Sequence, residues 1–319
     1  GSSLDKKQSV AMNILEYAIM DAPGAPLKKA LVDAGIGEDV FASFDDGIRQ
    51  TIFSIVARNA NMSDKERFVS VIRDTLTDLS GHGEEGKAID RTSIEAAINN
   101  FEFKHKEANF GRFPKGLMMG LDAFNTWLYD DASALEMFKL NEVYDELKES
   151  LKTGYFEELI WEKLVQNTFG MIFVMKPKKG LDKENDAAEK QKLADYKASL
   201  TENELEQVVS DTKELKLYQE TPSPAEDMEK VPLLNISDIR KEIHPLKNRE
   251  DSIYGMPLIC HDIFTNGIGY LEFIFDINDL DAEFVPYAEL LTNIFKYVDT
   301  EHYTYGELSN QINFHTGGI

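Results

Sequence analysis

The chain has 319 residues, and its 57 acidic side chains outnumber its 34 basic ones, which gives a formal net charge of −23. An apolar fraction of 42% is typical of a globular protein, and the length allows one large or two ordinary domains with cores of their own. The acidic surplus argues against a nucleic acid as partner, and no apolar run approaches the roughly 18 residues that a membrane span needs.

The first quarter of the chain predicts a strand between helices. Apolar residues at helical spacing predict a helix over residues 10–19, which ends at Ala22-Pro23-Gly24. A second short helix begins at Pro26, and residues 52–58 are apolar enough for a strand. Ser63 and Glu66 have the spacing of a capping box, which predicts that the next helix begins there.

The next hundred residues predict mainly helices. Helical spacing covers residues 91–106, a stretch through Trp127, residues 135–151 and residues 155–166. The apolar run at 168–175 then predicts a buried strand, which ends at Lys176-Pro177.

Residues 178–230 differ in composition, because they are strongly charged, contain few aromatic residues and carry no strand signal. Thr201 and Glu204 form a second capping box, so this segment predicts two helices that meet near Leu200. We interpret it as a helical linker between two globular parts.

The last part predicts strands followed by a helix. Strands around residues 256–264 and 268–275 flank Asn266-Gly267, a strong hairpin signal, and a helix begins at about Glu283. The single cysteine, Cys260, lies in the first of these strands, where we expect a buried structural thiol. One cysteine excludes an intramolecular disulfide and favours the cytoplasm or another reducing compartment; the first residues also lack the apolar core of a signal peptide.

Motifs for nucleotides and metals are incomplete. Residues 81–88 match G-x-G-x-x-G, but the loop follows a helix and carries two glutamates, so a flexible loop between helices is the better interpretation. Glu102 and His105 have the spacing of di-metal helical bundles, which need a second such pair. Residues 276–283 are acidic, but Asp281 stands where a calcium loop needs glycine.

No complete catalytic set is present in the sequence. There is no nucleophile elbow, and Cys260 has no evident activating partner. The remaining histidines have no ligand spacing, so we expect surface or packing roles for His82, His244, His261, His302 and His315.

Several segments, taken in order, resemble the presequence-protease-like branch of the pitrilysin/insulysin (inverzincin) zinc peptidases. Residues 4–180 look like most of that family's second domain, and residues 284–319 look like the start of its third domain. The most specific segments lie in the linker and just after it: Leu200-Thr-Glu-Asn-Glu-Leu205, Thr212-Lys-Glu-Leu215, Gln219-Glu-Thr-Pro222, Val231-Pro-Leu-Leu234 and Ser237-Asp-Ile239.

The resemblance implies an α+β fold. It predicts a metallopeptidase-like α/β sandwich domain, an antiparallel sheet with helices packed on it, over residues 1–180. A helical hairpin linker at 181–230 and a partial second α+β domain at 231–319 would follow. In that family two halves close on a chamber that admits unfolded peptides, and the first domain binds zinc through H-x-x-E-H, whose Glu activates the zinc-bound water.

At the matching position this chain has Pro286, Glu289 and Leu290, which keep only the glutamate. Without two histidines we expect no metal, cofactor or catalytic residue in this chain, and we expect zinc in a first domain that is missing. Glu289 is then a remnant of duplication or an ordinary helix residue; both interpretations stay open.

The resemblance therefore implies a non-catalytic central part of a zinc metalloendopeptidase that degrades short unstructured peptides, forming chamber wall and hinge. Its expected partners are the remaining domains and unstructured peptides, with no nucleic acid and no membrane. Alone, it should be inactive. The alternative is a standalone peptide-binding or scaffold protein without a catalytic partner. The ending at Gly317-Gly318-Ile319, after a helix that needs further strands, favours the fragment.

Overall fold

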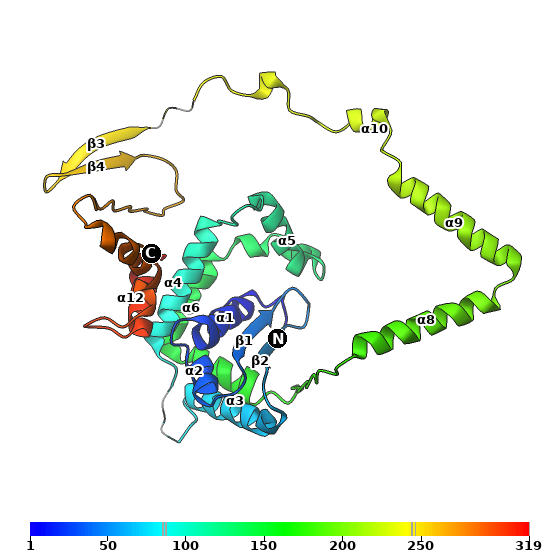
Figure 1. Cartoon of the computed structure of the whole chain (residues 1–319). Helices are drawn as coiled ribbons and strands as arrows, with labels where there is room; N and C mark the ends of the chain where they lie inside the picture. Colours follow the sequence, from blue (N-terminus) through cyan, green and yellow to red (C-terminus); the bar gives the residue numbers. More distant parts are fainter. Residues whose placement is uncertain (85, 87, 244, 246, 319) are drawn as a thin grey trace. The chain divides into compact units, whose positions relative to one another are not determined.

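The structure is a computed structural model that describes residues 1–84, 86, 88–243, 245 and 247–318, and only the backbone of Lys296. The described chain separates into two units, Gly1–Gly170 with Phe264–Ile319, and Met171–Ile263. Helices and small antiparallel sheets together make the fold α+β (Figure 1).

The first unit contains most of the elements. From the N-terminus to residue 165 these are α1 (Lys6–Glu16), η1 (Tyr17–Asp21), α2 (Pro26–Asp33), β1 (Asp39–Asp45), β2 (Ile52–Arg58), η2 (Met62–Asp64), α3 (Lys65–Leu79), α4 (Arg91–Glu107), α5 (Lys115–Trp127), η3 (Asp131–Ser133), η4 (Glu136–Phe138), α6 (Asn141–Ser150), η5 (Leu151–Thr153), α7 (Tyr155–Ile160) and η6 (Trp161–Val165). Its C-terminal part contains η8 (Ala282–Phe284), α11 (Val285–Ile294), η9 (Phe295–Tyr297) and α12 (Tyr305–His315).

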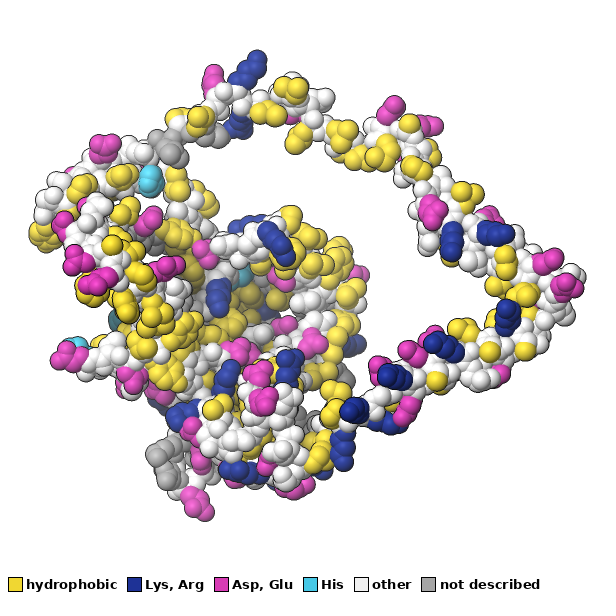
Figure 2. Space-filling view, in the orientation of Figure 1, with side chains coloured by type: hydrophobic (Ala, Val, Ile, Leu, Met, Phe, Trp, Pro, Cys, Tyr) yellow, Lys and Arg dark blue, Asp and Glu magenta, His cyan; other side chains and the backbone are white. Residues whose placement is uncertain are grey.

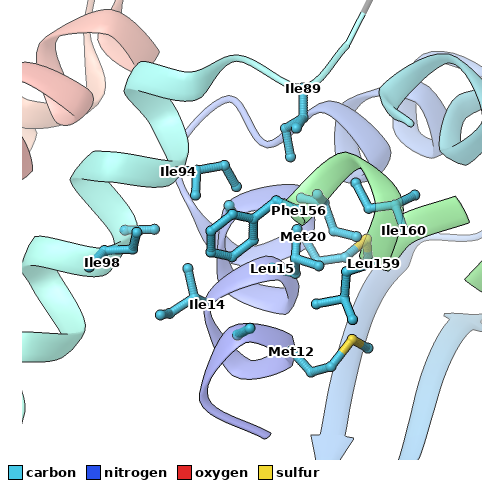
Figure 3. Close-up of a cluster of buried hydrophobic side chains, with 14 of the residues drawn as sticks. Met12, Ile14, Leu15, Met20, Ile89, Ile94, Ile98, Phe156, Leu159 and Ile160 are labelled. Carbon is cyan, nitrogen blue, oxygen red and sulfur yellow. The ribbon is translucent and has the colours of Figure 1, made fainter. Parts of the chain in front are cut away.

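The core of the first unit forms around α1. Asp5 caps this helix by accepting a hydrogen bond from the Gln8 N–H, and η1, a π-helix, continues it. Figure 3 shows side chains of α1, η1, α4 and α7 converging on one apolar cluster, with Ile14, Leu15 and Phe156 at most 1% exposed. Each such side chain contributes about 1.5–3 kcal/mol by leaving water.

The sheet of the first unit is one antiparallel hairpin. Its register pairs Val40 with Ala57 and Phe44 with Phe53. Side chains alternate between the two faces of a strand, so alternate residues of both strands pack against the core. These residues are Val40, Ala42, Phe44, Phe53, Ile55 and Ala57.

The second unit contains α8 (Leu181–Ser199), α9 (Glu202–Glu220), α10 (Ala225–Glu229), η7 (Ile236–Asp238), β3 (Asn248–Ile253) and β4 (Met256–His261). The predicted capping box of Thr201 and Glu204 is confirmed, and Leu200 separates the two long helices. In the part of the chain that the structure describes, neither of these helices contains a buried residue.

Three local predictions are wrong. Ser63 does not cap α3: the residue before α3 is Asp64, which makes no side-chain cap hydrogen bond. The strands predicted at 168–175 and 268–275 are absent from the described chain, and Phe169 and Ile274 are 96% and 90% exposed. A strand needs a neighbour for its backbone hydrogen bonds, and neither segment has one among the described residues.

The predicted hairpin exists one turn earlier. β3 pairs with β4 around Tyr254-Gly255, both at positive φ, whereas Asn266-Gly267 forms a turn without flanking strands. Cys260 does lie in a strand, but its side chain is half-buried rather than buried, because β4 has only β3 as a neighbour and Arg249 lies against its sulfur at 3.6 Å. The division at residues 180 and 230 stays a prediction.

Candidate functional site

The degenerate motif position lies on α11. Pro286 is in the first turn of the helix, where a missing N–H costs nothing. Glu289 and Leu290 follow on the exposed surface, and the Glu289 carbonyl accepts hydrogen bonds from the side chains of Thr292 and Asn293. Proline and leucine side chains offer no donor atom, and zinc takes three or four protein ligands, so these residues do not fit a zinc ion.

The Glu102–His105 pair is part of a structural ion network. Lys106 and Lys148 both donate hydrogen bonds to the Glu102 carboxylate at 2.5 Å, which ties α4 to α6. Burial favours the neutral acid, but the two lysines outweigh it, so the pKa of Glu102 is lowered. His105 lies 6.0 Å from the Tyr144 ring, and burial lowers its pKa. In the described chain no group of three or more His, Cys, Asp or Glu side chains is arranged for a metal ion.

The glycine-rich stretch forms the connection between α3 and α4, as predicted. A backbone bridge between Ser80 and Ala88 closes it. The His82 ring stacks on Trp161 at 4.0 Å, a packing role. Glu85 and Lys87 of this stretch, and His244, lie outside the described residues.

The other histidines are also placed. His261 ends β4, His302 follows α11 and η9 on the surface, and the His315 ring contacts Phe314 at 4.9 Å. The acidic stretch at 276–283 forms a turn, in which the Asn278 N–H donates to Asp276.

A polar group that the sequence patterns did not indicate lies between the β1–β2 turn, α4 and α5. Asn13 donates a 2.9 Å hydrogen bond to Asp46. Burial, and then the charge of Asp46, raise the pKa of Asp122, which in turn favours the charged form of His105. Burial likewise raises the pKa of Asp46. These half-buried carboxylates give this region a negative field that attracts cationic groups. Their sequence separation hid them, since no local spacing relates Asp46 to Asp122.

The most extensive functional candidate is uncovered apolar surface. On α5 and its flanks, apolar side chains recur every three or four residues and are 44–68% exposed, as for Phe113, Leu117, Leu121, Phe124 and Leu128. Figure 2 shows hydrophobic side chains gathered over this helix. Residues 169–175 and 270–277 are still more exposed, up to 96%. Surfaces of this kind mark interaction sites.

None of the helices in the described part of the chain combines the length and the apolarity that a membrane crossing requires.

Known proteins match the whole chain. A family described as associated with the M16 peptidases of subfamily C matches residues 175–319. The chain is 37% identical to Protein HypA of Clostridium perfringens, over all of this chain and 32% of that protein. It is 33% identical to Presequence protease 1, chloroplastic/mitochondrial, of Arabidopsis thaliana, over 99% of this chain and 29% of that protein.

A mitochondrial presequence protease of Yarrowia lipolytica is 26% identical over the full chain and 31% of its own length. The chain thus spans about a third of the length of the curated relatives it matches. These matches identify the chain as a presequence-protease-like segment of the pitrilysin-like M16 peptidases.

Proposed function

We propose that this chain is a non-catalytic part of a zinc metalloendopeptidase that degrades short unstructured peptides. The observation that carries the proposal is a similarity that covers all of this chain but only about a third of each relative. The degenerate position at Pro286, Glu289 and Leu290 supports it, because one carboxylate cannot make the ligand set of a catalytic zinc. Zinc would then be bound by a first domain outside this chain.

The chain would contribute chamber wall and hinge. The exposed apolar side chains of α5 and of residues 169–175 and 270–277 suit surfaces that the remaining domains or a peptide would cover. The helices α8 and α9, which have no buried residue in the described structure, suit a connection between halves. We therefore keep residues 1–180 as a second domain, 181–230 as a helical hairpin linker and 231–319 as the start of a third domain.

The net charge of −23 would favour basic peptides over acidic ones, and a nucleic acid is not a partner in this proposal. A reducing compartment such as the cytoplasm stays our proposal for its location; two of the relatives above are named as chloroplast or mitochondrial proteins.

Peptide cleavage tests the proposal. The purified chain and the protein expressed from the complete gene are each incubated with an unstructured fluorogenic peptide and zinc. We expect the chain alone to cleave nothing, and the complete protein to cleave the peptide until a chelator removes zinc. Zinc-dependent cleavage by the chain alone would refute the proposal. A complete gene product without cleavage would favour a peptide-binding or scaffold protein.

A further inference from the structure

The helix α12 docks on α4 and η1 within the first unit, although it is more than 200 residues away in sequence. The contact is made mainly by side-chain amides. Asn100 donates to Asn313 at 3.3 Å, Asn313 donates to the Tyr17 hydroxyl at 3.3 Å, Asn99 donates to the Phe314 carbonyl at 3.2 Å, and Asn310 donates to the Ser93 hydroxyl at 2.8 Å.

Glycines let the backbones approach at both ends of this contact. A Cβ on Gly306 would meet the Pro23 carbonyl oxygen at 3.3 Å and the Gly24 Cα at 3.6 Å. A Cβ on Gly317 would overlap the Phe103 ring at 2.2 Å. Any larger residue at Gly317 would force the ring or the chain to move, so the docked position depends on the absence of a side chain there.

This contact differs in kind from the apolar core below it. The buried residue of α12 is Asn313, whereas Leu308 and Ile312 are only half-buried. Asn100 is 7% exposed, and its side-chain oxygen has no hydrogen-bond partner among the described residues. Docking therefore buries an acceptor without full compensation, which release to water would relieve.

We propose that α12 is a reversible clasp, which docks on α4 and η1 through its asparagines and releases as a unit while the core of residues 1–165 stays folded. A net hydrogen bond contributes little, so amide contacts hold α12 mainly because the chain keeps it near its partner surface. The clasp joins residues of the predicted second and third domains, so its release would let those parts separate. The inference concerns this chain alone and stands whether or not the peptidase proposal is right.

Amide hydrogen exchange of the intact chain tests the clasp. We expect the amides of α12 to exchange at least tenfold faster than those of α1, because local release precedes global unfolding. Asn313→Ala removes the hydrogen bonds to Asn100 and Tyr17 and should accelerate exchange in α12 about tenfold, with α1 unchanged. Gln311→Ala, on the same helix, is the matched control and should change neither helix, because the Gln311 side chain makes no hydrogen bond to the described residues.

Equal protection of α12 and α1, or an equal acceleration of both by Asn313→Ala, would overturn the proposal, because α12 would then belong to the cooperative core. If Asn313→Ala does not fold, Asn310→Ala tests the same point at the edge of the contact. Proximity is checked with Ser93→Cys and Asn310→Cys in a Cys260→Ser background. A short bis-maleimide should join the two cysteines, and a docked α12 that cannot be crosslinked would contradict the clasp.

Discussion

Two regions of this chain contain similar apolar side chains with opposite surroundings. In residues 1–165 they converge on one core, where Phe156 is 1% exposed, whereas in residues 168–277 Phe169 is 96% and Ile274 is 90% exposed. Burial of apolar area is the main driving force of folding, so the first region stabilises itself and the second does not. In our account the second region is covered by other domains of a longer peptidase.

The largest expected effect comes from a pair of phenylalanines, one in each region. Phe156→Ala leaves a cavity between α1 and α7 and should lower the free energy of unfolding by about 3–5 kcal/mol. Phe169→Ala removes a ring that touches mainly solvent and should change it by less than about 0.5 kcal/mol. Urea unfolding followed by circular dichroism measures both. Similar losses for the two variants would show that Phe169 is buried in solution and would break the comparison.

A smaller loss is expected at the ion network between α4 and α6. Glu102→Gln leaves Lys106 and Lys148 without their carboxylate, and the side chain of Glu102 is only 17% exposed, so we expect a loss of about 1–3 kcal/mol. The lowered pKa of Glu102 has a pH consequence: this stability is present above the unfolded pKa and is lost as the pH falls through the folded value.

The control for Glu102 is Glu149→Gln. Glu149 also bonds a lysine, Lys152, at 2.7 Å, but it is 75% exposed, so its loss should be about 0–0.5 kcal/mol. Chemical denaturation at pH 7 compares the two. If they are equal, burial does not strengthen the network.

Glu16 should give a pH dependence of the opposite sign. Burial, and then the charge of Asp21, raise the pKa of this half-buried carboxyl from 4.5 to about 7. The folded protein then binds the proton more tightly than the unfolded chain, so the free energy of unfolding falls as the pH rises from 4.5 to about 7. Glu16→Gln should remove this fall, and after allowance for solvent screening should stabilise the protein by about 1–2 kcal/mol at pH 8.

Unfolding at pH 5 and pH 8 measures the effect of Glu16→Gln. Glu206→Gln, at an exposed position of α9, is the control and should leave the dependence as it is. A fall between the two pH values that survives in Glu16→Gln would assign it to another group.

The smallest expected effect concerns local support for the uncovered region. Thr201 accepts from the Glu204 N–H at the start of α9, and the described chain gives this helix no buried residue. Thr201→Ala should therefore destabilise α9 locally by about 0.5–1 kcal/mol, visible as faster amide exchange in its first turn. Thr212→Ala, within the same helix, is the control. An unchanged first turn in Thr201→Ala would mean that tertiary contacts hold α9.

Local signals in the sequence were sufficient for most helices. Residues 10–19, 91–106 and 155–166 lie within observed helical elements, and Thr201 and Glu204 form the predicted cap. Residues 52–58 form a strand as predicted, but the partner strand β1 was not predicted. Its apolar residues alternate, yet it is short and ends in aspartates, and its pairing with β2 is a tertiary fact.

Non-local contacts account for what the sequence did not reveal. The apolar patterns at 168–175 and 268–275 predict strands, but a strand forms only with a partner, and the described chain supplies none. The asparagines of α4 and α12 are likewise unremarkable until folding brings Asn100 beside Asn313. The position of Pro286, Glu289 and Leu290 on α11 was predictable, because the helix signal there is local.

The central claim is that this chain is part of a longer peptidase, and the mass of the native protein tests it most directly. An antibody raised against the chain is used on an immunoblot of the cells that make it. Because the chain spans 32% of HypA, we predict a band at about three times the 36.2 kDa of this chain. A band at 36.2 kDa would contradict the account and would favour a standalone binding protein.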